Sequence, residues 1–410
     1  MLACIISVRM KKTWLIPLLS LTVLLIATTI VILYGRGYRF GFDKGKVGIS
    51  GTGLLVTTSV PDGAQVFING HLTTATDNTI NLSPGTYDVK IFKEGYFSWQ
   101  KKLVIKEEVV TKADALLLPT APKLESITNN GVNNPTIDPT RTKIAYTTAS
   151  QAIKKNGIYV LDMTIKPILT LQSASTQIAD DTIASFSKAM IAWSPDAKEL
   201  VASISAEAFT STYLIQAGGF NSSPSDVTAT LMTVDAQWQK SKAEKEKARF
   251  DGLKKDLKKV TSENFDIISW SLDETKLLYK ASQSAELPII IKPRLIGVDS
   301  TFEQRNIEKG GIYVYDIKED KNFEIMKPDP NEQNGKNIPL SWFPDSKHLI
   351  YTHDKKIDIM EYDGANQTTV YAGPFINSYV FPWPDGSKLV ILTNLGNEEI
   401  EPNLYTISLK

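Results

Sequence analysis

The sequence predicts a mainly β protein with an N-terminal transmembrane helix, a small β-sandwich, and a β-propeller of five or six blades that carries a helical insertion. Three observations lead to this prediction. A short phrase containing Trp, Pro and Asp recurs through residues 136–410, an uncharged apolar run occupies residues 13–34, and residues 53–118 alternate strand-like runs with turns. The repeat carries the most weight, because a repeated unit fixes the architecture of most of the chain.

The apolar run at residues 13–34 contains no charged residue and is long enough to cross a bilayer. A helix rises ~1.5 Å per residue, so about 20 residues span the hydrocarbon core. Residues 1–12 form a short basic segment, as in export signals, and no small-residue cleavage site ends the apolar run. Basic residues also follow the run, so the positive-inside signal is not clean. We expect an uncleaved, single-pass signal anchor in the cell membrane, with the C-terminal domains extracytoplasmic.

Residues 35–52 are rich in Gly and Lys and are predicted to be a linker. Residues 53–118 then show the pattern of a compact β domain. Strands are expected at residues 54–58, 65–68 and 86–92, and a further strand is carried by residues 97–100 and 103–105. The turn residues Pro61-Asp62-Gly63-Ala64 and Asn69-Gly70 separate the first strands, since Pro presets φ and Gly and Asn tolerate a positive φ.

These turns resemble those of the PEGA domain, a small β-sandwich-like module named for its Pro-Glu-Gly-Ala turn. Here the turn is Pro61-Asp62-Gly63-Ala64, with Asp in place of Glu. The later phrase of that family matches Pro84-Gly85-Thr86-Tyr87, followed by a strand and Gly95-Tyr96. The resemblance covers residues 53–118 and implies a surface-exposed interaction or spacer module, often found in envelope proteins, with no catalytic residue.

Residues 119–135 contain three prolines and an Asn-Asn-Gly turn, and are predicted to link this domain to the repeats at residues 136–410. The clear copies of the repeated phrase contain Trp193-Ser194-Pro195-Asp196, Trp270-Ser271-Leu272-Asp273, Trp342-Phe343-Pro344-Asp345 and Trp383-Pro384-Asp385, and a fainter copy surrounds Asp138. A strand follows each copy. The Asp is expected to bond backbone N–H groups in a tight turn, and the Trp to fill space between sheets, so both have structural roles.

The repeated phrase resembles that of TolB-like or WD-like propellers, in which Ser-Pro-Asp-Gly-Lys lies between two strands. Only the last copy keeps the Gly, as Gly386, and Leu272 replaces the Pro in the second clear copy. The Asp positions lie 58, 77, 72 and 40 residues apart, whereas a blade needs ~40–45 residues, so the longer units carry insertions. Five blades are visible, and a sixth degenerate blade could lie within residues 200–265 or 285–340. The terminal strand at residues 403–409 is expected to help close the ring with the first blade.

Two insertions stand out among the repeats. Residues 235–260 favour a helix, with nine basic and five acidic side chains. One apolar stripe can dock this helix, formed by Trp238, Phe250, Leu253, Leu257 and Val260. The basic face is either solvated or available to anionic lipid or cell-wall polymer. The second insertion, residues 284–308, is expected as a hairpin or loop over one face of the ring.

The usual catalytic constellations are not found in the sequence. The histidines are His71, His348 and His353 and the single cysteine is Cys4, so no zinc set is expected. No hydrolase elbow, Walker A loop or dinucleotide fingerprint occurs. No catalytic, cofactor-binding or metal-binding residue and no cofactor is therefore predicted. The formal net charge of zero gives no reason to expect nucleic acid as a partner.

Three functions remain open on this basis. The first is a membrane-anchored extracytoplasmic envelope protein, attached through residues 13–34, whose PEGA-like and propeller domains bind a protein, peptide or glycan without catalysis. The second is a propeller enzyme that acts on envelope glycan or peptide through carboxylates in the central funnel. The third is a sensor or assembly factor that signals to a membrane partner, which the short segment before the anchor disfavours. We expect the first of these functions.

Overall fold

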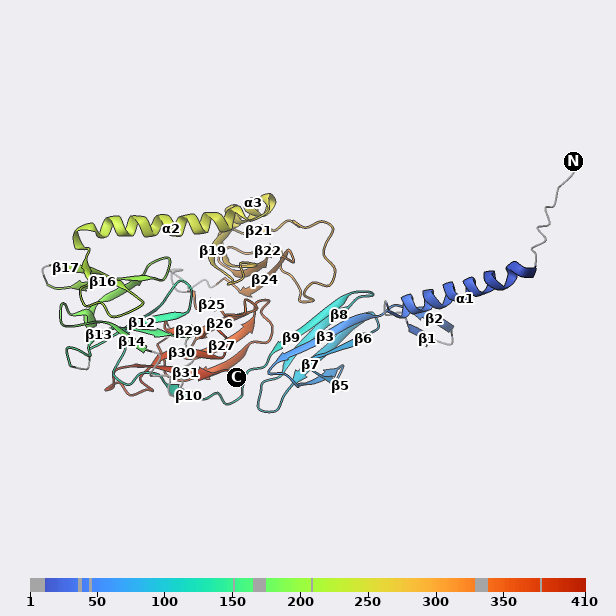
Figure 1. Ribbon diagram of the computed structural model, residues 1–410, viewed down its shortest axis with the longest axis horizontal. Helices are drawn as coiled ribbons and strands as arrows, with labels where there is room; N and C mark the ends of the chain where they lie inside the picture. The colour runs from blue at the N-terminus through green and yellow to red at the C-terminus, as the bar shows by residue number, and fades with distance from the viewer. Residues whose placement is uncertain are drawn as a thin grey trace. The chain divides into compact units, whose positions relative to one another are not determined.

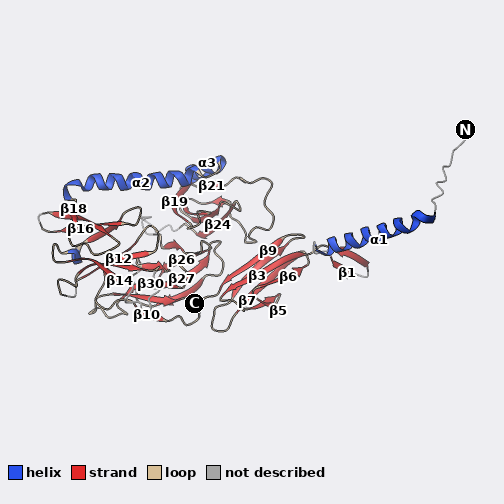
Figure 2. Cartoon of the chain, viewed as in Figure 1, coloured by secondary structure: helices blue, strands red, loops and turns tan. Residues whose placement is uncertain are grey.

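The computed structural model describes residues 12–35, 39–43, 46–149, 152–164, 175–207, 209–328, 338–376 and 378–410 (Figure 1). The chain divides into two compact units. The first comprises Met1–Lys93, Ser98–Leu116 and Leu295–Thr301, and the second comprises Glu94–Phe97, Leu117–Arg294 and Phe302–Lys410. Strands dominate both units, in agreement with the mainly β prediction (Figure 2).

The first helix, α1 (Lys12–Gly35), contains the apolar run predicted as the anchor. Its residues Ile16–Gly35 are long and apolar enough to cross a membrane, and none of the side chains in that window is buried in the protein. The hydroxyl groups of Thr22, Thr28 and Thr29 donate hydrogen bonds to backbone carbonyls four residues earlier, so these polar groups are satisfied within the helix. The predicted linker at residues 35–52 contains a two-stranded hairpin, β1 (Arg39–Asp43) with β2 (Lys46–Ser50).

Two sheets build the β domain of the first unit. The three-stranded sheet has the order β6-β3-β9, with β3 (Gly53–Val60) antiparallel to β6 (Asn78–Leu82) and parallel to β9 (Val110–Leu116). The four-stranded sheet has the order β5-β4-β7-β8, formed by β5 (His71–Ala75), β4 (Gln65–Ile68), β7 (Gly85–Phe92) and β8 (Trp99–Ile105). Alternate residues of β3, β7 and β8 are buried, as a half-buried strand requires.

The turns of this domain have the backbone that the sequence predicts. Asn69 and Gly70 both have positive φ, 50° and 81°, which is the conformation of a two-residue hairpin turn between β4 and β5. Gly63 has φ 68°, in the turn between β3 and β4. The first three predicted strands lie within β3, β4 and β7, and the fourth, predicted from residue 97, overlaps β8, which begins at Trp99.

Five four-stranded antiparallel sheets, each a blade-like unit, form the second unit. The first sheet consists of β11 (Asn133–Ile137), β12 (Lys143–Thr148), β13 (Gly157–Asp162) and β14 (Ser175–Asp180). The second consists of β15 (Met190–Trp193), β16 (Glu199–Ser205), β17 (Thr210–Gln216) and β18 (Ser225–Asp226). The third consists of β19 (Phe265–Trp270), β20 (Lys276–Ala281), β23 (Ile312–Asp316) and β24 (Lys321–Met326). The fourth consists of β25 (Leu340–Trp342), β26 (His348–His353), β27 (Lys356–Glu361) and β28 (Thr368–Ala372).

The fifth sheet joins the two ends of this unit. It contains β29 (Val380–Pro382), β30 (Lys388–Thr393) and β31 (Asn403–Ser408), and β10 (Leu124–Ser126) pairs with β31 as its fourth strand. The terminal strand is expected from the sequence to help close the ring with the first blade. Its Leu404 packs in a core with Ile144 and Leu161 of the first sheet, but its backbone pairs with β30 and β10 and not with a strand of that sheet. The early strand β10 crosses to the last sheet, because β31 offers it an open edge while the first sheet is completed by its own four strands.

The two segments that could have held a sixth blade have other structures. Residues 200–265 contain the outer strands of the second sheet and two helices, and residues 285–340 contain the short pair β21 (Ala285–Glu286) and β22 (Asn306–Ile307) beside strands of the third sheet. The described residues of the second unit thus contain five four-stranded sheets. The arrangement is a propeller-like series whose ring is not closed.

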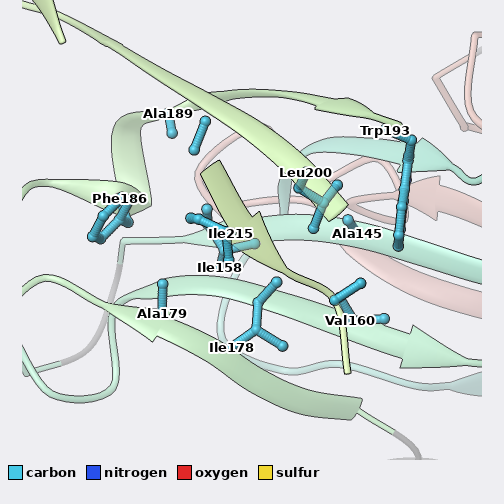
Figure 3. Close-up of a cluster of buried hydrophobic side chains, with 12 residues drawn as sticks. Ala145, Ile158, Val160, Ile178, Ala179, Phe186, Ala189, Trp193, Leu200 and Ile215 are labelled. Atoms are coloured by element: carbon cyan, nitrogen blue, oxygen red, sulfur yellow. The ribbon is translucent and has the colours of Figure 1, made fainter. Parts of the chain in front are cut away.

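Neighbouring sheets share hydrophobic cores. Ala145, Ile158 and Val160 of the first sheet pack against Trp193, Leu200 and Ile215 of the second (Figure 3). A second core joins the fifth sheet to the first, and a third core joins the third sheet to the fourth. The other face of the third sheet packs instead against Leu253, Leu257 and Val260.

The predicted helical insertion is present as two helices, α2 (Leu231–Asp251) and α3 (Lys255–Asn264). Gly252 still has a helical backbone, and Lys254, directly before α3, has an extended backbone that separates the two helices. Leu257 and Val260 are buried in α3 and Leu253 directly before it, and Phe250 packs against the same core, so four of the five stripe residues dock as expected. Trp238 is half-buried in α2, which has no buried residue. The helix α3 thus covers the face of the third sheet that lies opposite the fourth.

Candidate functional site

The repeated phrase forms the same turn in all five sheets. The residue at its tip has positive φ in every copy: Arg141 (57°), Ala197 (60°), Glu274 (55°), Ser346 (58°) and Gly386 (68°). Its N–H donates to the carbonyl three residues earlier, for example from Arg141 to Asp138. Aligned in this way, Asp138 takes the place of Ser194 and Thr140 that of Asp196. The sequence comparison that matched Asp138 with the later Asp residues is therefore shifted by two positions.

The repeated Asp residues have the structural role that the sequence predicts. Asp196, Asp273, Asp345 and Asp385 each accept a hydrogen bond from the backbone N–H two residues later, at 2.8–3.2 Å. At Asp196 the hydrogen bond from the Ser194 hydroxyl lowers the pKa of the carboxyl. These carboxylates are engaged in turns.

Two of the repeated Trp residues link the first strand of their sheet to the first strand of the preceding sheet. The indole Nε1 of Trp193 donates to the carbonyl of Thr136 at 3.1 Å, and that of Trp342 to the carbonyl of Ser269 at 3.5 Å. In the preceding sheet, each acceptor residue lies one position before the residue that is equivalent to the donor Trp. By this equivalence Trp270 would donate to Ala192, but its buried Nε1 has no acceptor among the described residues. The hydrogen bond that would join the first strands of the second and third sheets, β15 and β19, is therefore missing.

The helix α2 spans these two sheets (Figure 1). The ammonium group of Lys245 donates to the carbonyl of Pro195 at 2.7 Å, in the turn of the second sheet. The guanidinium of Arg249 donates to Glu274 at 2.8 Å, in the turn of the third sheet, and to Glu246 at 2.6 Å. The helix is therefore attached to both turns by polar contacts.

A cavity of about 640 Å³ lies beside this helix. We call it the Arg141 cavity, and it is lined by Pro139, Thr140, Arg141, Glu246, Arg249 and the consecutive residues 267–272. Its volume falls within the range of ligand sites, about 300–1,000 Å³. The lining combines apolar side chains of β19 with charged groups from the first sheet and α2.

Arg141 is the least compensated charge in this cavity. Its Nη1 donates to the carbonyl of Trp342 at 3.1 Å, and no carboxylate of the described residues lies within ion-pair distance of it. Burial lowers the pKa of Arg141, because desolvation disfavours the charged form. Arg249, in contrast, has two carboxylate partners.

The histidines considered in the sequence lie apart from this cavity. His71 is exposed, His348 bonds Asp345 at 2.6 Å, and His353 bonds Asp358 at 3.0 Å. In the part of the chain that the structure describes, no three His, Cys, Asp or Glu residues are grouped as a metal site would require. Cys4 lies outside the described residues.

Sequence reasoning missed Arg141. A signal was present: the copies put Ala, Glu, Ser or Gly at the turn tip, and the first copy alone has a long cation there. Because Asp138 was aligned with the later Asp residues, Arg141 was not recognised as the residue at the tip of the turn. The unpaired Trp270 could not have been found, because this copy keeps its Trp and the sequence does not show which carbonyl the Trp side chain reaches.

Comparison with known proteins identifies one domain. Residues 52–120 match the PEGA domain model, so the resemblance seen at residues 53–118 is confirmed. No curated protein matches the sequence of this chain.

Solved structures similar to the chain include two TolB proteins. Putative TolB from Agrobacterium tumefaciens is 15% identical, with 67% of this chain and 71% of that chain covered and a TM-score of 0.20. TolB from Acinetobacter baumannii is 13% identical, with 79% and 59% covered and a TM-score of 0.22. Hydrazine synthase from Kuenenia stuttgartiensis is 14% identical, with 90% and 99% covered and a TM-score of 0.20. Scores this low carry no argument about function, and the blade-like architecture rests on the strand order described above.

Proposed function

We propose that the protein is a membrane-anchored envelope protein that binds a protein, peptide or glycan partner outside the membrane without catalysis. Three features support this. The helix α1 has the length and composition of an anchor, residues 52–120 form a PEGA domain, and the second unit has a cavity of ligand size.

The observation that carries the proposal is the chemistry of the Arg141 cavity. Its charged lining residues are Arg141, Arg249 and Glu246, and Glu246 is paired with Arg249. General acid–base or glycosidic catalysis uses a positioned acid and base, commonly two carboxylates. This lining has only one carboxylate, whereas cations with apolar neighbours suit recognition of an anionic group.

The orientation of the chain is tested by labelling cysteines in intact cells. Cys4 is the only cysteine, so the variant Cys4→Ser with Lys154→Cys carries one thiol, on an exposed loop of the second unit. A membrane-impermeant maleimide should label this variant in intact cells and label Cys4 of the unchanged chain only after lysis. Equal protection of both thiols in intact cells would refute the extracytoplasmic placement.

Binding without catalysis is tested with the purified full chain in lipid nanodiscs. The chain is mixed with envelope protein extract, glycan fractions and cell-wall peptides, and both retention and chemical change are measured. We expect saturable retention of one fraction with no new product. Turnover of a glycan or peptide by the full chain would contradict this function.

A further inference from the structure

We propose that the Arg141 cavity binds an extended acidic peptide segment of a partner protein, with a peptide carboxylate on Arg141 and the peptide backbone along β19. This inference rests on the proposed function, since it names the ligand class of the same cavity. Two features of the cavity carry it, an uncompensated cation and an unpaired strand edge, and the ring of Trp270 adds apolar surface to the lining.

The guanidinium of Arg141 favours a ligand with an anionic group. Arg141 uses one nitrogen for the carbonyl of Trp342, and that neutral acceptor leaves the positive charge uncompensated. A half-buried charge without a partner is unfavourable, and a carboxylate can bind a guanidinium through two parallel hydrogen bonds. The other lining charges, Arg249 and Glu246, already pair with each other at 2.6 Å. Arg249 also pairs with Glu274 at 2.8 Å, so Arg141 is the cation of this lining that has no carboxylate partner among the described residues.

The strand edge favours a polypeptide over other anions. The strand β19 is an edge strand of the third sheet and pairs only with β20 among the described strands. Residues 267–272 line the cavity without interruption, so the backbone of this segment borders it as well as its side chains. An added strand would pair its backbone groups with such an edge, as in other cases of strand addition.

The indole of Trp270 differs from those of the equivalent Trp residues, because its N–H has no acceptor in the part of the chain that the structure describes. Trp193 and Trp342 donate to carbonyls of a neighbouring strand, whereas Trp270 lines the cavity with its N–H unsatisfied. A buried donor without an acceptor costs about 1–3 kcal/mol. Because the Nε1 atom itself is buried, the bound peptide contacts the ring of Trp270 that lines the cavity and not its N–H group. Side chains such as Ile267 and Leu272 add apolar contact for the residues between the acidic positions.

The test measures the affinity of the full chain in neutral-lipid nanodiscs for a fluorescent peptide of alternating Glu and Val. The matched peptide has Gln in place of Glu, and both are amidated at the C-terminus. We expect saturable binding of the Glu peptide, and at least tenfold weaker binding of the Gln peptide. Equal binding of the two peptides, or no binding of the Glu peptide, would overturn the inference.

Two variants locate the bound peptide. Arg141→Gln should weaken binding of the Glu peptide at least tenfold and leave binding of the Gln peptide unchanged. Trp270→Phe, which reduces the ring surface that lines the cavity, should weaken binding of both peptides several-fold. Lys154→Gln removes one exposed positive charge elsewhere in the second unit and should bind like the unchanged chain. Equal loss in the Lys154 and Arg141 variants would show non-specific charge attraction and overturn the inference.

The same experiment distinguishes the inference from the proposed function. Thermal unfolding of each variant confirms that it is folded before its affinity is interpreted. An acidic polysaccharide is included as a second probe. If only the polysaccharide binds and depends on Arg141, the peptide is the wrong ligand class while the proposed binding function stands. If an envelope partner binds the unchanged chain and the Arg141→Gln variant equally, the proposed function again stands and this cavity is not its site.

Discussion

Replacement of Asp320 should destabilise the second unit more than any single surface change, because this carboxylate holds the insertion at residues 284–308. Asp320 is 1% exposed. Its Oδ2 accepts hydrogen bonds from the backbone N–H groups of Ile290 and Ile291, both at 2.8 Å. Its Oδ1 accepts from Arg305 at 3.2 Å and from the hydroxyl of Tyr315. One side chain thus satisfies four donors from three segments.

The size of the effect follows from what Asp320→Ala leaves behind. Arg305 would lose this buried carboxylate partner, although Glu303 still bonds its Nε at 2.9 Å. Two backbone N–H groups would lose their acceptor. Removal of one partner from a buried ion pair costs about 3–5 kcal/mol, and we expect a loss in this range. Burial, followed by the hydrogen bond to this carboxylate, raises the pKa of Tyr315, so the variant should also lower that pKa.

The variant Asp320→Asn removes the negative charge of the side chain and keeps its shape, so it measures the contribution of the charge. Asp320 has φ 53°, a conformation that Asn also tolerates, so the backbone is not strained by the change. The amide keeps one acceptor oxygen and loses the charge, so its destabilisation should lie below that of Asp320→Ala. Asp251→Ala serves as the exposed control, since its contact with Lys258 at 3.7 Å is at the surface and is worth about 0–1 kcal/mol.

The assay is urea unfolding of the full chain combined with hydrogen exchange of individual amides. The free energy of unfolding of the second unit should fall in the order Asp251→Ala, Asp320→Asn, Asp320→Ala, and the amides of Ile290 and Ile291 should lose protection in the alanine variant. A loss below about 1 kcal/mol for Asp320→Ala, with both amides still protected, would refute the reasoning.

Three further predictions concern the second unit. Trp193→Phe should lower the free energy of unfolding by about 1 kcal/mol more than Trp270→Phe, because only Trp193 has an acceptor to lose; equal losses in urea unfolding would be inconsistent with this. Burial opposes the charged form of His353, but hydrogen bonds to aspartates outweigh it and raise its pKa. Its stabilising contribution should be complete below the unfolded pKa, about 6.5, and disappear as pH rises through the folded pKa; unfolding of His353→Gln measured across this range should lack that decline, and an unchanged pH profile would exclude the effect. Leu257→Ala should cost about 2–5 kcal/mol, since Leu257 is 2% exposed in the core between α3 and the third sheet; a loss below 1 kcal/mol in the same assay would mean that α3 is not docked.

The repeats were predictable because their turn chemistry is local. A Pro-Asp phrase before an apolar run requires no tertiary information, and four clear copies fix the positions of four sheets. The PEGA domain was predictable for the same reason, since Gly63 and Gly70 stand where positive φ is needed. The strands β5 and β6 were missed because their sequences, HLTTA and NTINL, are mostly exposed and lack a buried alternation.

Pairings between distant segments could not be predicted. Nothing in residues 124–126 indicates that they complete a sheet with residues 405–407, because strand pairing depends on which edge the fold leaves open. The Arg141 cavity is a similar case. Its lining residues come from the first sheet, α2 and the third sheet. Arg141 lacks a carboxylate partner there because Glu246 and Glu274 both pair with Arg249 in the folded protein.

Site-specific cross-linking in intact cells tests the central claim most directly. A photo-reactive amino acid replaces Leu272, which lines the Arg141 cavity and is 45% exposed, in the full chain and in its Arg141→Gln variant. The account predicts one cross-linked polypeptide with the unchanged Arg141 and its loss in the variant. A photo-reactive residue at Lys154 should give no such product. No cross-link from position 272, or the same cross-link in both chains, would contradict the claim that this cavity binds the partner.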